Sequence, residues 1–256
     1  MGVMENSCWF LLSIGVAGVL LTCVVNAGAA EPDTRCYELR IYYAAPDKLE
    51  ALEARFRDHT CKLFEKHGFT NIGYWTPVDN PDNKLVYIIA SPSREAHETT
   101  WKAFSNDPEW KEVVKTTEAN GKLVTKVDSI YLKAADFSPA IEPSVDSQPR
   151  CFELRTYDAA PGKLDALLAR FRDHTLALFI KHGMTNIGYW TNTKPDSSQL
   201  VYILAHKSKE AATESFKNFR VDPAWLEAKK NSEVNGSLTT KVDSVFMTPL
   251  DYSPLK

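Results

Sequence analysis

Apolar and polar positions alternate along residues 36–42. The first face of this stretch comprises Tyr37, Leu39 and Ile41, and the second comprises Glu38, Arg40 and Tyr42. A period of two is typical of a β-strand with two unlike faces. The pattern returns in residues 151–157, where Glu153, Arg155 and Tyr157 keep the polar set unchanged.

Helical spacing follows this strand. Leu49, Leu52, Phe56 and Leu63 are separated by three, four and seven residues, which predicts one helix over residues 46–66 with a buried face. The elements expected after it are strands at 72–76 and 85–90, a helix at 93–106, a helix that begins at Asp107 and Pro108, and a strand at 123–132. Asp can cap exposed amides and Pro suits the first helical position, so the third helix has a defined start.

The chain contains a tandem duplication. Residues 66–76 (KHGFTNIGYWT) return as residues 181–191 (KHGMTNIGYWT), at an offset of 115 residues, and the two copies align at this offset without a gap. A repeat of this length indicates one domain present twice. The domains expected are 31–137 and 150–256, with a linker at 138–149.

Each copy has the order βαββαβ with an extra helix before its last strand, the ferredoxin-like arrangement of an α+β protein. Such a sheet carries its helices on one face. The face with Glu38, Arg40, Tyr42, Lys126 and Asp128 is too polar for an ordinary core and too aromatic for solvent. We therefore expect the two sheets to face each other and enclose these residues, so that the copies form one pseudo-symmetric barrel.

The N-terminus has the features of a signal peptide. Residues 9–25 form an uninterrupted weakly polar run, and the small residues at 27–29 suit signal peptidase. These features predict a signal peptide over residues 1–30 and a secreted or periplasmic protein. The alternative is an uncleaved leader that anchors the chain, since the run is about long enough to span a bilayer.

Charge and motifs exclude several functions. The net charge of −3 gives no footprint for nucleic acid. Five cysteines, two of them in the leader, are too few for a disulfide framework. The nucleophile-elbow, zinc-protease, dinucleotide and Walker patterns are absent from the sequence. His59 and His67 cannot share a metal, because eight residues of helix separate them by about 12 Å. No metal site and no cofactor are predicted.

Five short motifs resemble those of the NIPSNAP family. They are Glu38-Leu39-Arg40-x-Tyr42, Lys66-His67-Gly68, Gly73-Tyr74-Trp75, Asp107-Pro108-x-Trp110 and Pro161-Gly162-Lys163-Leu164. The resemblance covers residues 35–134 and 150–249, and it implies a dimeric α/β barrel, here formed within one chain. Superfamily relatives include cofactor-free monooxygenases, isomerases and haem enzymes that use the cavity between sheet and helices. Animal members are mitochondrial, but this leader lacks the arginines of a transit peptide, so that role is not carried over.

The ligand-binding candidates are Glu38 and Arg40 with their counterparts Glu153 and Arg155. Residues on the same face of a strand lie about 7 Å apart, so a carboxylate and a guanidinium there can converge on one ligand. The alternative is a structural ion-pair network that includes Lys126 and Asp128.

Trp75 and Trp190 are further ligand-binding candidates. An indole could form the wall of a site for a planar ligand, and the alternative is that both side chains fill the core.

The catalytic candidates are His59 and His174, together with Tyr42 and Tyr157. Each histidine follows a phenylalanine by three residues, at the edge of the expected buried face. A histidine there could transfer protons, ligate a haem or pack as a hydrogen-bonded core residue.

These patterns leave two classes of function open. We expect an exported NIPSNAP-type protein that binds a small molecule or a protein partner, and whose pseudo-dimer could assemble further. The alternative is a cofactor-free monooxygenase or isomerase that uses Tyr42, His59 and Arg40 or their counterparts. A closed pocket would favour the enzyme, and a sheet face filled by Glu–Arg pairs would favour a scaffold.

Overall fold

The computed structural model describes residues 33–141, 143 and 150–256. The predicted signal peptide and its cleavage point lie outside the described residues, as does most of the predicted linker. Among the described residues, no helix has the length and apolar character needed to cross a membrane.

The two repeats have the same elements in the same order. The first comprises β1 (Cys36–Ala44), α1 (Leu49–Arg55), η1 (Phe56–Thr60), α2 (Cys61–His67), β2 (Thr70–Pro77), β3 (Lys84–Ser91), α3 (Arg94–Asn106), α4 (Pro108–Thr117) and β4 (Val124–Ala134). The second comprises β5 (Cys151–Ala159), α5 (Leu164–Arg170), η2 (Phe171–Thr175), α6 (Leu176–Lys181), β6 (Thr185–Asn192), β7 (Gln199–His206), α7 (Lys209–Val221), α8 (Pro223–Ser232) and β8 (Thr239–Pro249). The predicted order βαββαβ with an extra helix is confirmed.

Local chemistry explains where several elements begin and end. The side chain of Ser93 caps α3 by accepting a hydrogen bond from the amide of Ala96, and Asp107 caps α4 through the amide of Glu109. Gly68, with φ of +96°, ends α2 in the left-handed region that favours glycine.

The predicted first helix contains a π-helical turn. The sequence Phe-Arg-Asp-His-Thr forms this turn in both repeats, as η1 and η2. The hydroxyl of Thr60 donates to the carbonyl of Arg55 at 3.1 Å, and Thr175 donates to Arg170 at the same distance. Each side chain thus satisfies a carbonyl five residues earlier, where the regular ladder is disturbed.

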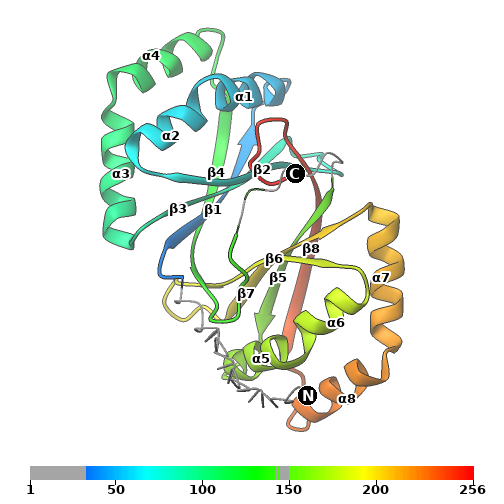
Figure 1. Ribbon diagram of the computed structural model, residues 1–256. Coiled ribbons are helices and arrows are strands. Elements are labelled where there is room, and N and C mark those ends of the chain that lie inside the picture. Colours follow the sequence, from blue (N-terminus) through cyan, green and yellow to red (C-terminus); the bar gives the residue numbers. More distant parts are fainter. Residues whose placement is uncertain (1–32, 142, 144–149) are drawn as a thin grey trace, which may run out of the picture. The chain divides into compact units, whose positions relative to one another are not determined.

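All eight strands form one closed antiparallel barrel, in the order β1-β3-β2-β8-β5-β7-β6-β4. The repeats are joined at two places, where β2 pairs with β8 and β4 pairs with β6. The helices of each repeat lie outside the strands (Figure 1). The predicted α+β class and the intramolecular dimeric α/β barrel are confirmed.

The segments after β4 and β8 strengthen these joins. The hydroxyl of Ser138 accepts a hydrogen bond from the amide of Tyr189 at 3.0 Å, and the hydroxyl of Ser253 accepts one from the amide of Tyr74 at 2.9 Å. The end of each repeat is therefore held by a strand of the other repeat.

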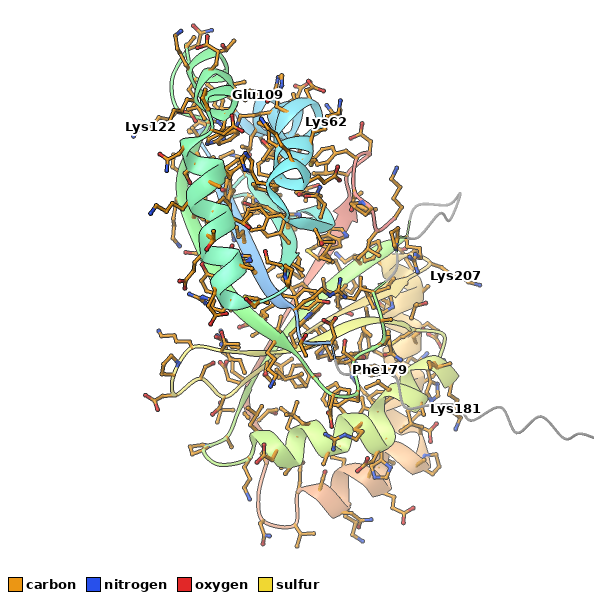
Figure 2. The ribbon with its side chains drawn as sticks, turned by 60° about the vertical axis from the view of Figure 1, so that its left-hand side comes forward. Lys62, Glu109, Lys122, Phe179, Lys181 and Lys207 are labelled. Atoms are coloured by element: carbon orange, nitrogen blue, oxygen red, sulfur yellow. The ribbon has the colours of Figure 1, made fainter. Side chains whose placement is uncertain are left out.

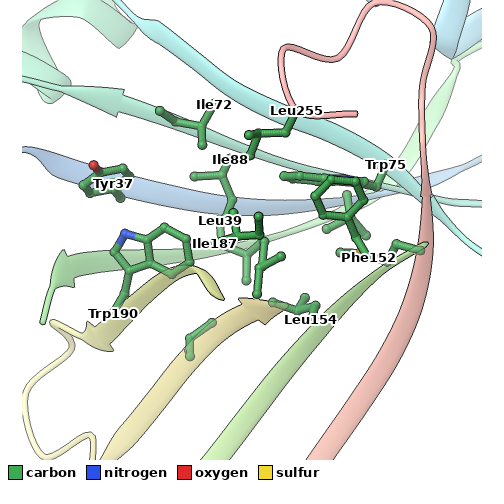
Figure 3. Close-up of a cluster of buried hydrophobic side chains, with 14 of the residues drawn as sticks. Tyr37, Leu39, Ile72, Trp75, Ile88, Phe152, Leu154, Ile187, Trp190 and Leu255 are labelled. Atoms are coloured by element: carbon green, nitrogen blue, oxygen red, sulfur yellow. The ribbon is translucent and has the colours of Figure 1, made fainter. Parts of the chain in front are cut away.

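Apolar side chains from both repeats fill the barrel interior (Figure 3). The rings of Tyr37 and Trp190 have centroids 5.6 Å apart, and so do those of Trp75 and Phe152. All four side chains are fully buried. These pairs cross from one repeat to the other, so the interior is a shared core.

The glycine of the Gly-Tyr-Trp motif allows the tryptophan to pack. A Cβ atom on Gly73 would lie 2.2 Å from the ring of Trp75, and one on Gly188 would lie 2.5 Å from the ring of Trp190. A side chain at either glycine would displace the indole from the core. The motif thus has a structural role.

The prediction that Glu38, Arg40 and Tyr42 face into the barrel is wrong. Tyr37 and Leu39 point inward, and the polar face of β1 points toward the helices. The barrel interior is lined mainly by apolar side chains, which cannot compensate a buried charge. In the first repeat, α3 lies over this polar face and supplies two of the donors, His97 and Trp101.

Lys126 and Asp128 do not join this polar face. They pair with each other at 3.0 Å, and their side chains are 60% and 38% exposed. The structural ion pair between Glu38 and Arg40, which was the alternative to a ligand site, therefore forms without Lys126 and Asp128.

Two aromatic cores lie between the sheet and the helices, one in each repeat. Phe179 on α6 is buried in the second of these cores, whereas Lys62 and Glu109 are exposed on the outer surface of the first repeat (Figure 2). The polar face of each sheet is adjacent to these outer cores, and the candidate site is located there.

Candidate functional site

Trp75 and Trp190 lie in the barrel interior, on the opposite face of the sheet from the Glu–Arg pairs. Their indole nitrogens have no hydrogen-bond partner in the part of the chain that the structure describes. Both side chains fill the core, and the structure does not bring them together with Glu38 or Arg40.

His59 and His174 are exposed, so their predicted place at the edge of the buried face is wrong. The π-helical turn changes the angular spacing after Phe56 and Phe171, and it turns the third following residue toward solvent. His59 lines a surface groove beside Glu109 and is not part of the polar face formed by Glu38, Arg40 and Tyr42.

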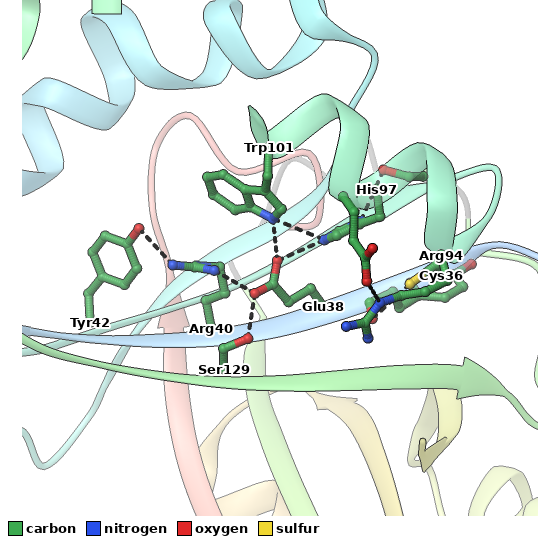
Figure 4. A network of polar contacts seen from close by, with 11 residues as sticks. Cys36, Glu38, Arg40, Tyr42, Arg94, His97, Trp101 and Ser129 are labelled. Carbon is green, nitrogen blue, oxygen red and sulfur yellow. Dashed lines mark hydrogen bonds and ion pairs between the residues drawn. The ribbon is translucent and has the colours of Figure 1, made fainter. Parts of the chain in front are cut away.

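In the first repeat, the carboxylate of Glu38 is completely buried and accepts four side-chain hydrogen bonds (Figure 4). Arg40 Nη1 donates at 2.5 Å and Ser129 Oγ at 2.5 Å to one oxygen. His97 Nε2 donates at 2.8 Å and Trp101 Nε1 at 2.7 Å to the other. The donors come from β1, β4 and α3, so Glu38 ties the sheet to the helix layer.

These partners keep Glu38 ionised. Burial alone would raise the pKa of this carboxyl, but the hydrogen bond from His97, the charge of Arg40 and the hydrogen bonds from Ser129 and Trp101 lower its pKa to about 2. The pair with Arg40 is therefore a buried ion pair at neutral pH.

The second repeat holds Glu153 with three side-chain donors. Arg155 Nη1 and Ser244 Oγ each donate at 2.5 Å, and His206 Nε2 donates at 3.1 Å. Phe216 stands where the first repeat has Trp101, so no indole reaches this carboxylate. Burial would raise the pKa of Glu153, but the hydrogen bond from His206, the charge of Arg155 and the hydrogen bonds from Ser244 and Arg155 lower it.

The histidine that contacts the buried glutamate lies at a different position in each repeat. His97 lies on α3, and its counterpart in the second repeat is Ala212; His206 lies at the end of β7, and its counterpart is Ser91. Each repeat therefore keeps one imidazole on its buried glutamate, although the two histidines do not correspond in sequence. The Nδ1 atom of His97 contacts Ser91 at 3.0 Å.

The arginines connect each glutamate to the phenol groups of Tyr42 and Tyr157, two of the catalytic candidates. Arg40 Nη2 donates to the hydroxyl of Tyr42 at 3.3 Å, and Arg155 Nη2 donates to Tyr157 at 3.2 Å. Arg155 Nε also donates to Tyr202 at 2.8 Å. The structure thus brings glutamate, arginine and tyrosine together in each repeat, without His59 or His174.

A cavity of about 300 Å³ lies between the sheet and the helices of the second repeat. This volume is at the lower end of the range for small-molecule sites. Its lining comprises Arg155, Tyr157, Arg170, Phe171, Thr175, Phe179, Phe216, Phe219, Arg220, Trp225, Lys229, Glu233, Ser237, Thr239 and Val242. Six of these side chains are aromatic, and Arg155, the ion-pair partner of Glu153, also lines the cavity.

At the corresponding place in the first repeat, Trp101 takes the position of Phe216. Its indole lies 4.4 Å from the guanidinium of Arg40, and its ring centroid lies 5.5 Å from Phe64 and 4.9 Å from Phe69. Phe216 packs on Arg155 in the same way, at 4.8 Å, but its ring is smaller than an indole. The two repeats share a fold but differ at this point in packing.

Reasoning from the sequence missed His97, His206 and Trp101. A usable signal was present, because the repeats differ reciprocally at two positions, with Ser91 and His97 in one and His206 and Ala212 in the other. The described residues contain no group of three or more His, Cys, Asp or Glu side chains that could hold a metal ion.

These features define a dimeric α/β barrel built within one chain, with a buried Glu–Arg–Tyr row in each half. The NIPSNAP family model matches residues 37–139 and 152–254, so the chain belongs to the NIPSNAP family. No curated protein matches the sequence.

Solved structures share the fold. A proposed monooxygenase from Lactobacillus acidophilus is 12% identical, with 84% of this chain and 94% of that chain covered and a TM-score of 0.57. An anthrone oxidase-like protein is 13% identical, with 85% and 92% covered and a TM-score of 0.56. A NIPSNAP family protein with unknown function from Agrobacterium tumefaciens is 23% identical, with 43% and 97% covered and a TM-score of 0.39. The likeness to the first two structures concerns the fold alone.

Proposed function

We propose that the protein binds a small molecule with a planar, apolar body, and that the ligand occupies the cavity of the second repeat. The observation that carries this proposal is the cavity itself, whose lining combines six aromatic side chains with Arg155, the ion-pair partner of Glu153. Pockets of this kind bury the body of a ligand among rings and orient it with a few polar groups.

The first repeat acts mainly as a scaffold in this proposal. Its buried carboxylate has an additional donor, Trp101, and the indole packs over Arg40. A site needs unoccupied volume beside its polar groups, and in this proposal the smaller ring of Phe216 leaves volume beside Arg155 that Trp101 fills beside Arg40. One ligand per chain is therefore expected.

Exchanging the two aromatic residues tests this proposal. In the Phe216→Trp variant, the larger indole should fill the cavity and weaken binding of the neutral probe 2-naphthamide about tenfold or more. The matched Trp101→Phe variant changes the other repeat and should bind the probe as the unaltered protein does. Isothermal titration calorimetry on the full chain measures both the affinity and the stoichiometry.

Two outcomes would contradict the proposal. One is the absence of saturable binding by the unaltered protein. The other is binding that Phe216→Trp leaves unchanged, which would place the ligand elsewhere. Circular dichroism of both variants checks that each remains folded.

We further propose that the chain is exported, because an apolar run at residues 9–25 is followed by small residues at 27–29. The mature protein should then begin at Ala30 or Glu31. Sequencing the N-terminus of protein from soluble and membrane fractions tests this proposal, and an intact Met1 in the membrane fraction would favour an anchor instead.

A further inference from the structure

The cationic side chains around the second-repeat cavity fall into two groups. The first group is buried and already paired: Arg155 contacts Glu153 at 2.5 Å, and Arg170 contacts Glu233 at 2.8 Å. Each of these positive charges is compensated by a carboxylate beside it. They provide hydrogen bonds to the cavity but little net charge.

The second group is Arg220 on α7 and Lys229 on α8. Both side chains line the cavity and both are exposed, so they lie at its rim. Neither forms an ion pair with any of the residues that the structure describes. The guanidinium of Arg220 lies 5.8 Å from the ring centroid of Phe216, so it is adjacent to the aromatic wall. Two uncompensated positive charges therefore border the opening.

This rim is a property of the second repeat. The residues at the corresponding positions of the first repeat are Ser105 and Val114. Both cations therefore occur only in the repeat in which Phe216 leaves the cavity open. The exposed lysines at nearby positions, Lys217 on α7 and Lys230 on α8, do not line the cavity.

A hydrogen-bond donor without an acceptor lies deeper in the same cavity lining. The Nε atom of Arg170 is buried and has no hydrogen-bond partner in the described part of the chain, and the side chain is only 5% exposed. Arg55 Nε has the same property, so this donor belongs to the repeat unit and not to the second copy alone. This donor is therefore independent of the two cations at the rim, which occur only in the second repeat.

We propose that the ligand of this cavity is an anion with an aromatic body, of which an aromatic carboxylic acid is the simplest example. This inference rests on the proposed function and specifies its ligand class. The rings of Phe171, Phe216 and Trp225 cover the body, and Arg220 and Lys229 hold the carboxylate at the rim. Guanidinium and ammonium groups recognise carboxylates through charge-assisted hydrogen bonds.

The test compares two probes of nearly equal shape, 2-naphthoate and 2-naphthamide, by calorimetry on the full chain. The carboxylate should bind about tenfold more tightly than the amide, and the difference should shrink as salt is added. Arg220→Ser and Lys229→Val replace each cation by the residue at the corresponding position of the first repeat, Ser105 and Val114. Each should weaken binding of naphthoate about twofold to fivefold and leave binding of the amide unchanged.

The matched controls are Lys217→Ser and Lys230→Val, which remove a positive charge from the same helices outside the cavity. They should bind both probes as the unaltered protein does. Equal affinities for the two probes, or equal losses in the control variants, would overturn the proposed anion preference and leave the binding function intact. If neither probe binds saturably, the proposed function fails, and this inference fails with it.

Discussion

At the scale of single residues, both repeats surround a buried carboxylate with hydrogen-bond donors. Glu38 and Glu153 each accept hydrogen bonds from an arginine, a serine and a histidine, although the histidine lies on a helix in one repeat and at a strand end in the other. An unpaired buried carboxylate would be costly, so the imidazole is needed but its position in the sequence is not fixed.

This carboxylate should make stability depend on pH. The pKa of Glu38 is about 2 in the folded protein, against an ordinary value of 4.5, so folding favours its ionised form. The stabilisation is fully present above pH 4.5 and is lost as the pH falls toward 2, and it amounts to about 3 kcal/mol. The Glu38→Gln variant should therefore lose less free energy of unfolding than the unaltered protein over this range.

Urea unfolding at several pH values between 5 and 2.5 measures this difference. Glu50→Gln, which changes an exposed glutamate on α1, is the control and should follow the unaltered protein. If Glu38→Gln shows the same acid dependence as the unaltered protein, then Glu38 is not the group that the fold holds ionised.

At the scale of elements, local signals predicted where helices and strands lie. The caps at Ser93 and Asp107 and the left-handed Gly68 depend on residues close in sequence, and the structure has all three. The π-helical turn was not predicted, because Leu52, Phe56 and Leu63 are all buried and their spacing fits an uninterrupted helix. His59 was misplaced for that reason.

The orientation of β1 could not be predicted from its alternation. A period of two defines two faces but does not say which one faces the barrel, and here both faces are largely covered. The answer depends on the donors His97 and Trp101, which lie 59 and 63 residues after Glu38. The sequence alone likewise does not show that Trp101 and Phe216 each pack on an arginine. The difference in their size therefore could not be related to a cavity before the structure was known.

At the scale of the whole molecule, the barrel depends on both repeats. The interior core contains residues of each, and two of the eight strand pairings join one repeat to the other. Two ion pairs at equivalent positions add to these joins: Arg57 with Asp251 at 2.9 Å, and Arg172 with Asp136 at 2.7 Å. These pairs are exposed, so the apolar interior is the main source of stability.

A single repeat should therefore be unable to exist as a stable monomer. A fragment of residues 33–141 would expose the inner face of its sheet, including Leu39, Trp75 and Ile88, and it would leave the edges of β2 and β4 unpaired. Since β4 and β8 are equivalent elements of the two repeats, a second copy of the fragment offers β2 the same kind of partner. We expect the fragment to form a homodimer or to aggregate, and we expect it to form a heterodimer with a co-expressed fragment of residues 150–256.

Sedimentation equilibrium and native mass spectrometry distinguish these species. A well-folded, monodisperse monomer of either fragment would show that the inner face of the sheet does not need the other repeat, contrary to the packing of Trp75 on Phe152 and of Tyr37 on Trp190.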